Sequence, residues 1–422
     1  MKAYIIHDGK DRETGLIREE LEKLLTVRGY TVNGINITES GLKRCLVCNY
    51  CGNKNPGVCA RKDGGNDLVK GAAQCDLLVV ISSISFGGYS AAGKLGFERT
   101  IPNVNPFFLI HQGELHHRIR YSPSPDFLMI GWHPENDPGE AVLFRRLAER
   151  NAVNFLSSGY GSAVFSGTPD LPAVRETLTS ALHDIETVRR PRCPDLDPVR
   201  DSPLTGTSVK PWLIISCSGR KKSNSLAIAG YLKDVLGHQN ISTADVDLAR
   251  DGMIEGDMED LVDKIKSSEG LFIISPLYHD TLSYPAVKLL EYLHSRKESL
   301  PGEIPVAALI HSGYPEPVHC RNALGILKIF TRTMDWNWKG GFSAGMTSPI
   351  GGKPLEEAGF ITRKLRKSLN QGAAALAGKR ELPEPVKPVM PPRLLCLMGN
   401  KMLKKEMAQK NIDYNARPFA EV

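Results

Sequence analysis

The chain repeats one pattern twice: a short apolar strand that ends in a polar loop, followed later by a second apolar strand with a similar exit. The first strand covers residues 3–6 in one half and 213–215 in the other, and the second covers residues 76–83 and 270–276. Amphipathic helices separate the strands. Continuous Val, Ile and Leu runs between helices are typical of a parallel sheet covered on both faces. We therefore expect two tandem α/β units, each built on a doubly wound parallel sheet.

The spacing of the strand ends indicates a duplication with one insertion. His7 precedes Ser82 by 75 residues, whereas Ser216 precedes Ser275 by 59. The difference (75 − 59 = 16) equals the length of the segment 45–60. The first half is therefore predicted to resemble the second half with one loop inserted.

Composition shifts along the chain predict four parts. Residues 1–185 form the first domain, with the inserted loop, and residues 211–380 form the second. The Pro/Arg/Asp-rich stretch 186–210 is predicted to be a linker. Residues 381–422 form a proline-rich tail that carries a short basic helix at 394–410.

Composition also excludes several functional classes. The net charge of +6 over 422 residues is modest and no dense Lys/Arg run occurs, so nucleic-acid binding has no support. Because a strand-like run opens the chain at residues 3–6, we expect no signal peptide, and no apolar stretch is long enough to predict a bilayer-spanning helix. Nine cysteines, four of them in one loop, suit a reducing compartment better than a disulfide framework. We expect a cytoplasmic protein that binds neither membrane nor nucleic acid.

The four crowded cysteines follow the pattern Cys45-x2-Cys48-x2-Cys51-x7-Cys59. Three thiolates at every third residue can wrap one inorganic cluster, and the fourth can close the cage. Zinc sites more often use two separated cysteine pairs, so this spacing favours an iron–sulfur cubane over zinc. The alternative is a structural group of thiols without a cluster.

The loop after the first strand of the second half has the composition of a phosphate site. Hydroxyl side chains, backbone N–H groups and a helix N-terminus together suit a phosphate dianion. An ordinary helix N-cap on a surface loop would also explain the serines. The residues predicted to bind are Ser218, Arg220, Ser223, Asn224 and Ser225.

Two further loops are predicted to lie at the same edge of the second sheet. The loop Pro276, Leu277, Tyr278 and His279 follows the third strand, and its Pro-x-Tyr sequence can place amides and an aromatic ring along a flat ligand. The loop Ser312, Gly313 and Tyr314 follows the next strand, and its glycine permits close approach of the backbone. Three such loops suit a phosphate joined to a planar heterocycle.

These residues resemble a known family. Residues 211–380 are similar to flavodoxin-fold NAD(P)H-dependent FMN reductases, whose phosphate loop matches Ser218 to Ser225 position by position. Residues 1–185 resemble the iron–sulfur flavoproteins of the same superfamily, which carry a compact four-cysteine motif like the one from Cys45 to Cys59. The resemblance implies flavodoxin-like five-stranded sheets in the order 2-1-3-4-5. It also implies FMN in the second domain, a [4Fe-4S] cluster at the cysteines and NAD(P)H as an electron donor.

The corresponding phosphate loop of the first half has lost the pattern. Asp8, Asp11 and Glu13 place three carboxylates where a dianion would bind, although Lys10 and Arg12 partly offset them. We therefore expect the first domain to bind FMN weakly or not at all.

A third strand of the first half is expected at residues 109–113, matched to 309–313 in the second half. The loop after it contains His116 and His117 with two arginines. This loop suits an anionic substrate, an NADPH phosphate or a proton shuttle, or it is a solvated loop without a ligand. The catalytic candidates are His116, His117, Tyr278 and His279.

Reductases of this family often place each flavin at a dimer interface. The tandem is therefore expected to be a monomeric pseudo-dimer or a homodimer, in which the first domain covers the FMN of the second. The predicted function is a flavin-dependent oxidoreductase that passes electrons from NAD(P)H or ferredoxin to an unidentified acceptor. An electron carrier between protein partners is the alternative, and a scaffold that has lost its cofactors is a third.

Overall fold

The computed structural model describes residues 1–187, 210–378 and 382–420. The chain forms two compact units: unit 1 comprises Met1–Pro194 with Pro392–Val422, and unit 2 comprises Asp195–Pro391. Most of the predicted linker, residues 188–209, lies outside the described residues. Each unit is described by itself below.

Unit 1 is built on five parallel strands in the order β2-β1-β3-β7-β8. The short β4 (Gly88–Tyr89) pairs antiparallel with the end of β3 as a sixth strand. Counted along the parallel strands, the order is 2-1-3-4-5, which confirms the predicted fold. The strands are β1 (Lys2–His7), β2 (Thr31–Asn36), β3 (Leu77–Ser85), β7 (Asp126–His133) and β8 (Tyr160–Ser166).

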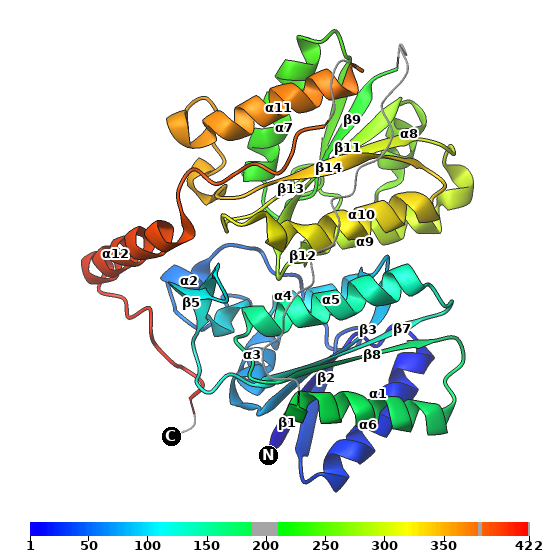
Figure 1. Ribbon diagram of the computed structural model, residues 1–422, viewed down its shortest axis with the longest axis vertical. Coiled ribbons are helices and arrows are strands. Elements are labelled where there is room, and N and C mark those ends of the chain that lie inside the picture. The colour runs from blue at the N-terminus through cyan, green and yellow to red at the C-terminus, as the bar shows by residue number, and fades with distance from the viewer. Residues whose placement is uncertain (188–209, 379–381, 421–422) are drawn as a thin grey trace. The chain divides into compact units, whose positions relative to one another are not determined.

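Helices cover both faces of this sheet (Figure 1). Alternate residues of β1 point to opposite faces. Ala3 and Ile5 join the core beneath two helices, and Tyr4 and Ile6 join the core beneath three others. The first core contains α1 (Arg12–Val27) and α6 (Leu171–Thr187); the second contains α3 (Gly65–Gln74), α4 (Ala91–Glu98) and α5 (Pro138–Asn154).

A separate antiparallel hairpin corrects the prediction for the third strand. Residues predicted to enter the parallel sheet at 109–113 instead belong to β5 (Val104–His111) and to its turn into β6 (Glu114–Ile119). Gln112 and Gly113 form the tight turn, with φ of 51° and 87°. The true counterpart of the strand at 309–313 is β7, which ends, like it, in a histidine.

Unit 2 repeats the architecture with the order β10-β9-β11-β13-β14, again parallel, and β12 (Thr281–Leu282) pairs antiparallel with the end of β11. Helices α7 and α11 pack on one face, and α9 and α10 lie on the other (Figure 1). The strands are β9 (Trp212–Ser216), β10 (Thr243–Asp247), β11 (Gly270–Tyr278), β13 (Pro305–His311) and β14 (Asn337–Ala344). The helices are α7 (Asn224–Gly237), α8 (Glu259–Lys266), α9 (Tyr284–Ser295), α10 (Arg321–Thr333) and α11 (Arg363–Leu376).

The extra length of unit 1 lies between β2 and α3. This connection runs from Asn36 to Gly65, whereas its counterpart in unit 2 runs from Asp247 to Glu259, so it is 17 residues longer (29 − 12 = 17). It contains the four cysteines and one helical turn, α2 (Tyr50–Asn53).

The last helix, α12 (Pro392–Lys410), returns to unit 1 and packs on the β5–β6 hairpin. The Asn400 side chain bonds both backbone groups of Phe108: the Phe108 amide donates to Oδ1 at 2.7 Å, and Nδ2 donates to the carbonyl at 2.9 Å. Among the described residues, no helix has both the length and the apolar character that a bilayer crossing requires.

Candidate functional site

Three loops of unit 2 follow neighbouring strands at one edge of the sheet. Strands β9, β11 and β13 are adjacent and parallel, so their carboxyl ends meet at the same edge. Ligands of open α/β sheets bind at this edge, where the strand order reverses. The predicted binding residues are in these loops or at the strand ends that lead into them.

The loop between β9 and α7 presents a row of backbone donors. Ser223 caps α7, because its Oγ accepts a hydrogen bond from the Leu226 amide at 3.1 Å. The backbone amides from Lys221 to Ser225 donate to no other protein group in the described structure. Arg220, Lys221 and Lys222 are exposed beside them. Free amides, a helix N-terminus and cationic side chains together fit a phosphate.

Two of the predicted phosphate-binding residues hold the loop in place from within. Asn224 uses its whole amide: Nδ2 donates to the Thr347 carbonyl at 2.7 Å, and Oδ1 accepts from the Gly352 amide at 2.8 Å. Ser218 Oγ accepts from the Arg220 amide at 3.2 Å. These side chains therefore position the backbone donors.

A buried histidine, which sequence reasoning did not select, connects this loop to the next strand. The Thr347 hydroxyl donates to the Ser312 carbonyl, so it accepts from His311 Nδ1 at 3.1 Å. His311 Nε2 then accepts from Ser225 Oγ at 2.8 Å. Burial, and secondarily Arg220, lowers the pKa of His311 to about 3. His311 is therefore neutral and locks three loops together. The sequence signal that could have identified His311 is its position at the end of a buried strand.

The second loop differs in extent from the prediction. Pro276 and Leu277 are buried inside β11, and only Tyr278 and His279 reach its end. His279 and Asp280 form a two-residue hairpin turn, with φ of 53° and 54°. Both Tyr278 and His279 are half-buried beside the ligand edge.

The third loop is fixed to the second by residues that sequence reasoning missed. Tyr314 stacks on His319, with ring centroids 4.6 Å apart. His319 Nδ1 lies 2.9 Å from the Asp280 carboxylate, and both side chains are buried. Ser312 Oγ accepts from the Tyr314 amide at 3.0 Å, while Gly313 is exposed. The second and third loops therefore form one rigid rim.

The cysteine segment of unit 1 has an irregular backbone around Cys48. Val47 and Asn49, on either side of Cys48, adopt left-handed conformations with φ of 53° and 56°. Such conformations are costly for a β-branched residue and gather at functional sites. The Val47 amide donates to Cys45 Sγ at 3.3 Å, so one backbone amide points toward a thiol.

The spacing of the thiols distinguishes between kinds of metal site. Among the described residues, no three of the four thiols have all their sulfur atoms within 4.8 Å of one another. One tetrahedral ion would need them closer than this, whereas a cubane with iron at each corner separates its ligands further. Burial raises the pKa of Cys45 to about 12 and of Cys51 to about 11, so without metal both thiols stay protonated. The four residues fit a cluster, whose binding would release these protons.

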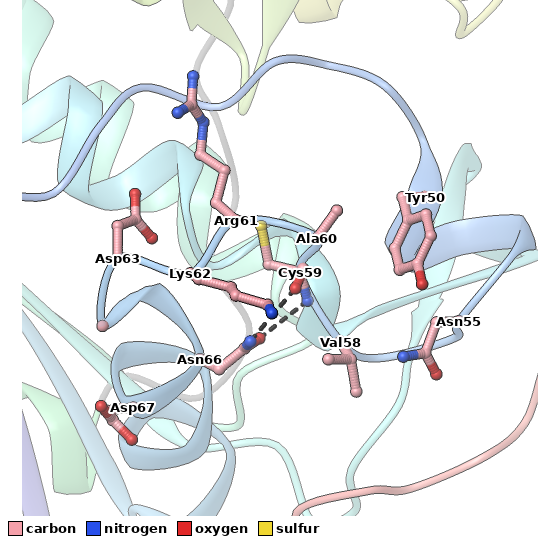
Figure 2. A pocket seen from close by; sticks show the side chains of 11 residues that line it. Tyr50, Asn55, Val58, Cys59, Ala60, Arg61, Lys62, Asp63, Asn66 and Asp67 are labelled. Carbon is pink, nitrogen blue, oxygen red and sulfur yellow. Dashed lines mark hydrogen bonds between the residues drawn. The ribbon is translucent and has the colours of Figure 1, made fainter.

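Two side chains fasten the fourth cysteine. Asn66 Oδ1 accepts from the Cys59 amide at 2.8 Å, and Nδ2 donates to its carbonyl at 3.2 Å, as Figure 2 shows. Arg99 forms a bidentate pair with Asp63 and donates to Cys59 Sγ at 3.5 Å. An open pocket of about 350 Å³ lies beside this cysteine, with Tyr50 at one side (Figure 2).

The catalytic candidates His116 and His117 lie on strand β6, which corrects the prediction of a loop at the sheet edge. His116 is buried, with Nδ1 3.1 Å from Asn154 Oδ1. His117 stacks on Phe108, and burial lowers its pKa to about 4. The structure does not bring them to the carboxyl edge of the sheet of unit 1, where β7 ends at His133.

In unit 1, the loop that corresponds to the phosphate loop is filled by its own carboxylate. Asp8 is fully buried and accepts from the Ser83 amide and from Ser90 Oγ, both at 2.7 Å, and from the Lys10 amide at 3.2 Å. Asp11 accepts from Ser83 Oγ. Asp8 thus takes up the Lys10 amide and the donors of Ser83 and Ser90, and the carboxylates of Asp8 and Asp11 would repel a phosphate here.

Comparison with known proteins agrees with this description. The chain is similar to an iron–sulfur flavoprotein of Methanocaldococcus jannaschii, with 30% identity over 89 residues, which are 21% of this chain and 45% of that protein. The match thus spans less than half of the curated relative. No protein-family model matches the chain.

One solved structure with a similar fold is a flavodoxin from the domain Archaea, which is 14% identical to this chain. The alignment covers 40% of this chain and 96% of the flavodoxin, with a TM-score of 0.29. A second is the NAD(P)H:quinone oxidoreductase of Methanothermobacter marburgensis, which is 13% identical to this chain. The alignment covers 44% of this chain and 96% of the oxidoreductase, with a TM-score of 0.33. The strand order itself carries the assignment: both units have flavodoxin-like sheets.

Proposed function

We propose that the chain is a flavin-dependent oxidoreductase that binds FMN in unit 2 and a [4Fe-4S] cluster in unit 1. The observation that carries the proposal is the row of free amides from Lys221 to Ser225 at the start of α7, set at the ligand edge of a doubly wound sheet. The similarity to an iron–sulfur flavoprotein supports the same function.

In this proposal the loop from Ser218 to Ser225 binds the phosphate. The rim formed by Tyr278, His279 and Tyr314 flanks the ring system, and Gly313 allows the backbone to approach it. FMN, when bound, supplies exchange between two-electron and one-electron chemistry. The neutral His311 keeps a positive charge out of the loop interior and holds Ser225 in place.

The cluster would be held by Cys45, Cys48, Cys51 and Cys59, and it would supply one-electron transfer. The Val47 amide donates to Cys45 Sγ, and Arg99 contributes a positive charge beside Cys59. NAD(P)H is the proposed donor, and the acceptor is a small molecule or a protein.

The test is an anaerobic preparation reconstituted with FMN, iron and sulfide and then desalted. We expect one FMN and four irons per chain. R220A should weaken FMN binding by about tenfold, the effect of losing one charge-assisted contact. K264A, an exposed substitution on α8, is the matched control. A wild-type protein that keeps no flavin after desalting would refute the proposal.

An electron carrier without a small-molecule substrate is the second candidate. Cys48 is exposed, which would place one corner of a cluster at the surface, within reach of a protein partner. Stopped-flow reduction by NADH, NADPH and reduced ferredoxin separates the two. Fast reduction by ferredoxin alone supports the carrier, and fast reduction by a nicotinamide supports the enzyme.

A further inference from the structure

The C-terminal end of the chain lies against the cysteine segment of unit 1. We call residues 411–420 the C-terminal strap. Tyr414 is fully buried, with its ring 6.5 Å from that of Phe107. Farther along, the Phe419 amide donates to the Tyr121 hydroxyl at 3.2 Å, and the Phe419 carbonyl accepts from Gln74 Nε2 at 2.9 Å. The strap is therefore held at both ends.

Arg120 holds the middle of the strap. Its guanidinium is buried, and Nη1 donates to the carbonyls of Tyr414 and Ala416 at 2.8 and 2.7 Å. On its other side, Nε donates to the Pro102 carbonyl at 3.0 Å and Nη2 to the Val104 carbonyl at 3.3 Å. One side chain thus joins the strap to the body of unit 1.

The strap and Arg120 meet the cysteine segment at Gly57. The Gly57 amide donates to the Cys51 carbonyl at 2.9 Å. A Cβ atom at this glycine would lie 2.8 Å from Pro418 of the strap and 3.1 Å from Arg120 Cδ. Its φ of +85° also favours glycine. The backbone next to a predicted cluster ligand is therefore packed directly against the strap.

The guanidinium of Arg120 forms no direct ion pair in the described structure. All four hydrogen bonds of its guanidinium end on neutral carbonyls, and none of the carboxylates in the described parts of the chain forms an ion pair with it. A buried cation normally has an anionic partner. The Asp413 carboxylate of the strap is close enough to act on its charge, and the Arg120 side chain itself packs against Gly57 of the cysteine segment.

We propose that the C-terminal strap is part of the cysteine site, and that Arg120 is the positioning residue that joins the two. The proposal deepens the proposed function and rests on its cluster. Residues that follow unit 2 in the sequence thus complete a site in unit 1.

The test compares wild type with four variants after anaerobic reconstitution. Three of them change the strap or Arg120: deletion of 411–422, R120M and R120K. The fourth, R145M, removes an exposed arginine of α5 and is the matched control. Iron, sulfide and FMN per chain are measured on each. Loss of an outer contact of a metal site typically lowers affinity about 10–100-fold. We expect R120M and the deletion to lose most of their iron, R120K to keep an intermediate amount, and R145M to match wild type. FMN content should be the same in all variants, because FMN is expected to bind in unit 2. A constant FMN content therefore shows that unit 2 is folded.

A second measurement does not depend on the cluster. In metal-free protein, the alkylation rate of Cys51 is followed by peptide mass spectrometry, with the buried Cys217 as internal reference. Faster alkylation of Cys51 in the deletion, which keeps the charge of Arg120, supports the proposal. Iron content and alkylation rates equal to wild type in R120M and in the deletion overturn it. If wild type itself binds no iron, the cluster of the proposed function fails, and the alkylation rates alone decide whether the strap braces the cysteine segment.

Discussion

The first loops of the two units occupy the same place in the fold and have opposite electrostatic character. In unit 1, four residues link β1 to α1, and the buried Asp8 accepts the hydrogen bonds of Ser83 and Ser90. In unit 2, seven residues link β9 to α7, and the amides from Lys221 to Ser225 remain available. One loop supplies its own anion, and the other is open to one.

This difference shows how little of the chain decides whether such a unit has a ligand site. The strand orders agree, and Asp8 and Cys217 occupy equivalent positions, each donating its amide to the neighbouring strand at 3.0 and 2.8 Å. Three additional residues and the loss of two carboxylates, those of Asp8 and Asp11, separate the two loops. The predictions below test this contrast.

The largest expected effect concerns His311 and its counterpart His133. The pKa of His311 is about 3 in the folded protein and about 6.5 when unfolded, so only the unfolded state takes up a proton between these values. The stability of unit 2 should therefore be complete above pH 6.5 and fall as the pH drops toward 3, by up to about 4 kcal/mol. Hydrogen exchange of peptides from β9 measures it. H311Q should flatten this dependence of stability on pH, and H133Q should leave it unchanged. If H311Q shows the same dependence as wild type, the fall in stability does not come from His311.

Cys217→Asp should give unit 2 the carboxylate of unit 1. A like charge at this buried position beside the phosphate loop costs about 2–3 kcal/mol, so the Kd for FMN should rise roughly a hundredfold. Titration followed by flavin fluorescence measures this. C217N has nearly the same shape without the charge and should lose far less affinity. Equal losses in the two variants would show that packing, and not charge, is responsible.

The reverse change, Asp8→Asn, should destabilise unit 1 by about 1–2 kcal/mol, because hydrogen bonds to a charged group are replaced by neutral ones. Urea unfolding measures the loss. The flavin count should remain one per chain, since Asp11 and the short loop persist. A second bound FMN in D8N would mean that the Asp8 carboxylate alone excludes the ligand.

The smallest effect is expected at the fourth cysteine. Asn66→Ala removes both bonds to the Cys59 backbone, each worth about 1 kcal/mol, and should lower iron affinity by about tenfold. Competition with an iron chelator measures it. N55A, at the opposite side of the same pocket, is the control. Unchanged iron retention in N66A would show that Asn66 does not support iron binding.

Much of the fold was predictable because buried strands have a strong local signature. The continuous apolar runs of β1, β3, β9 and β11 predicted parallel strands, and the structure confirms them. The prediction that residues 109–113 belong to the parallel sheet was wrong for a physical reason. An apolar run that ends in histidine occurs in both β5 and β7, and only the Gln112-Gly113 turn distinguishes the hairpin strand from the sheet strand.

The candidate site was predictable in part. The loop from Ser218 to Ser225 has a pattern that can be recognised locally, because capping and amide exposure depend on neighbouring residues. His311, Asp280 and His319 had no such pattern. Their roles depend on partners 39 to 86 residues away, and a sequence does not show such distances in space.

By itself, the sequence determined the two α/β units, the location of the cysteine segment and the basic phosphate loop, since each depends on residues close together in the chain. Only the tertiary structure decided which hydrogen-bond donors are free, that Asp8 fills its own loop, and that Arg120 joins the C-terminal strap to the cysteine segment. Packing brings these groups together from distant parts of the chain, and burial then determines which charges need a partner.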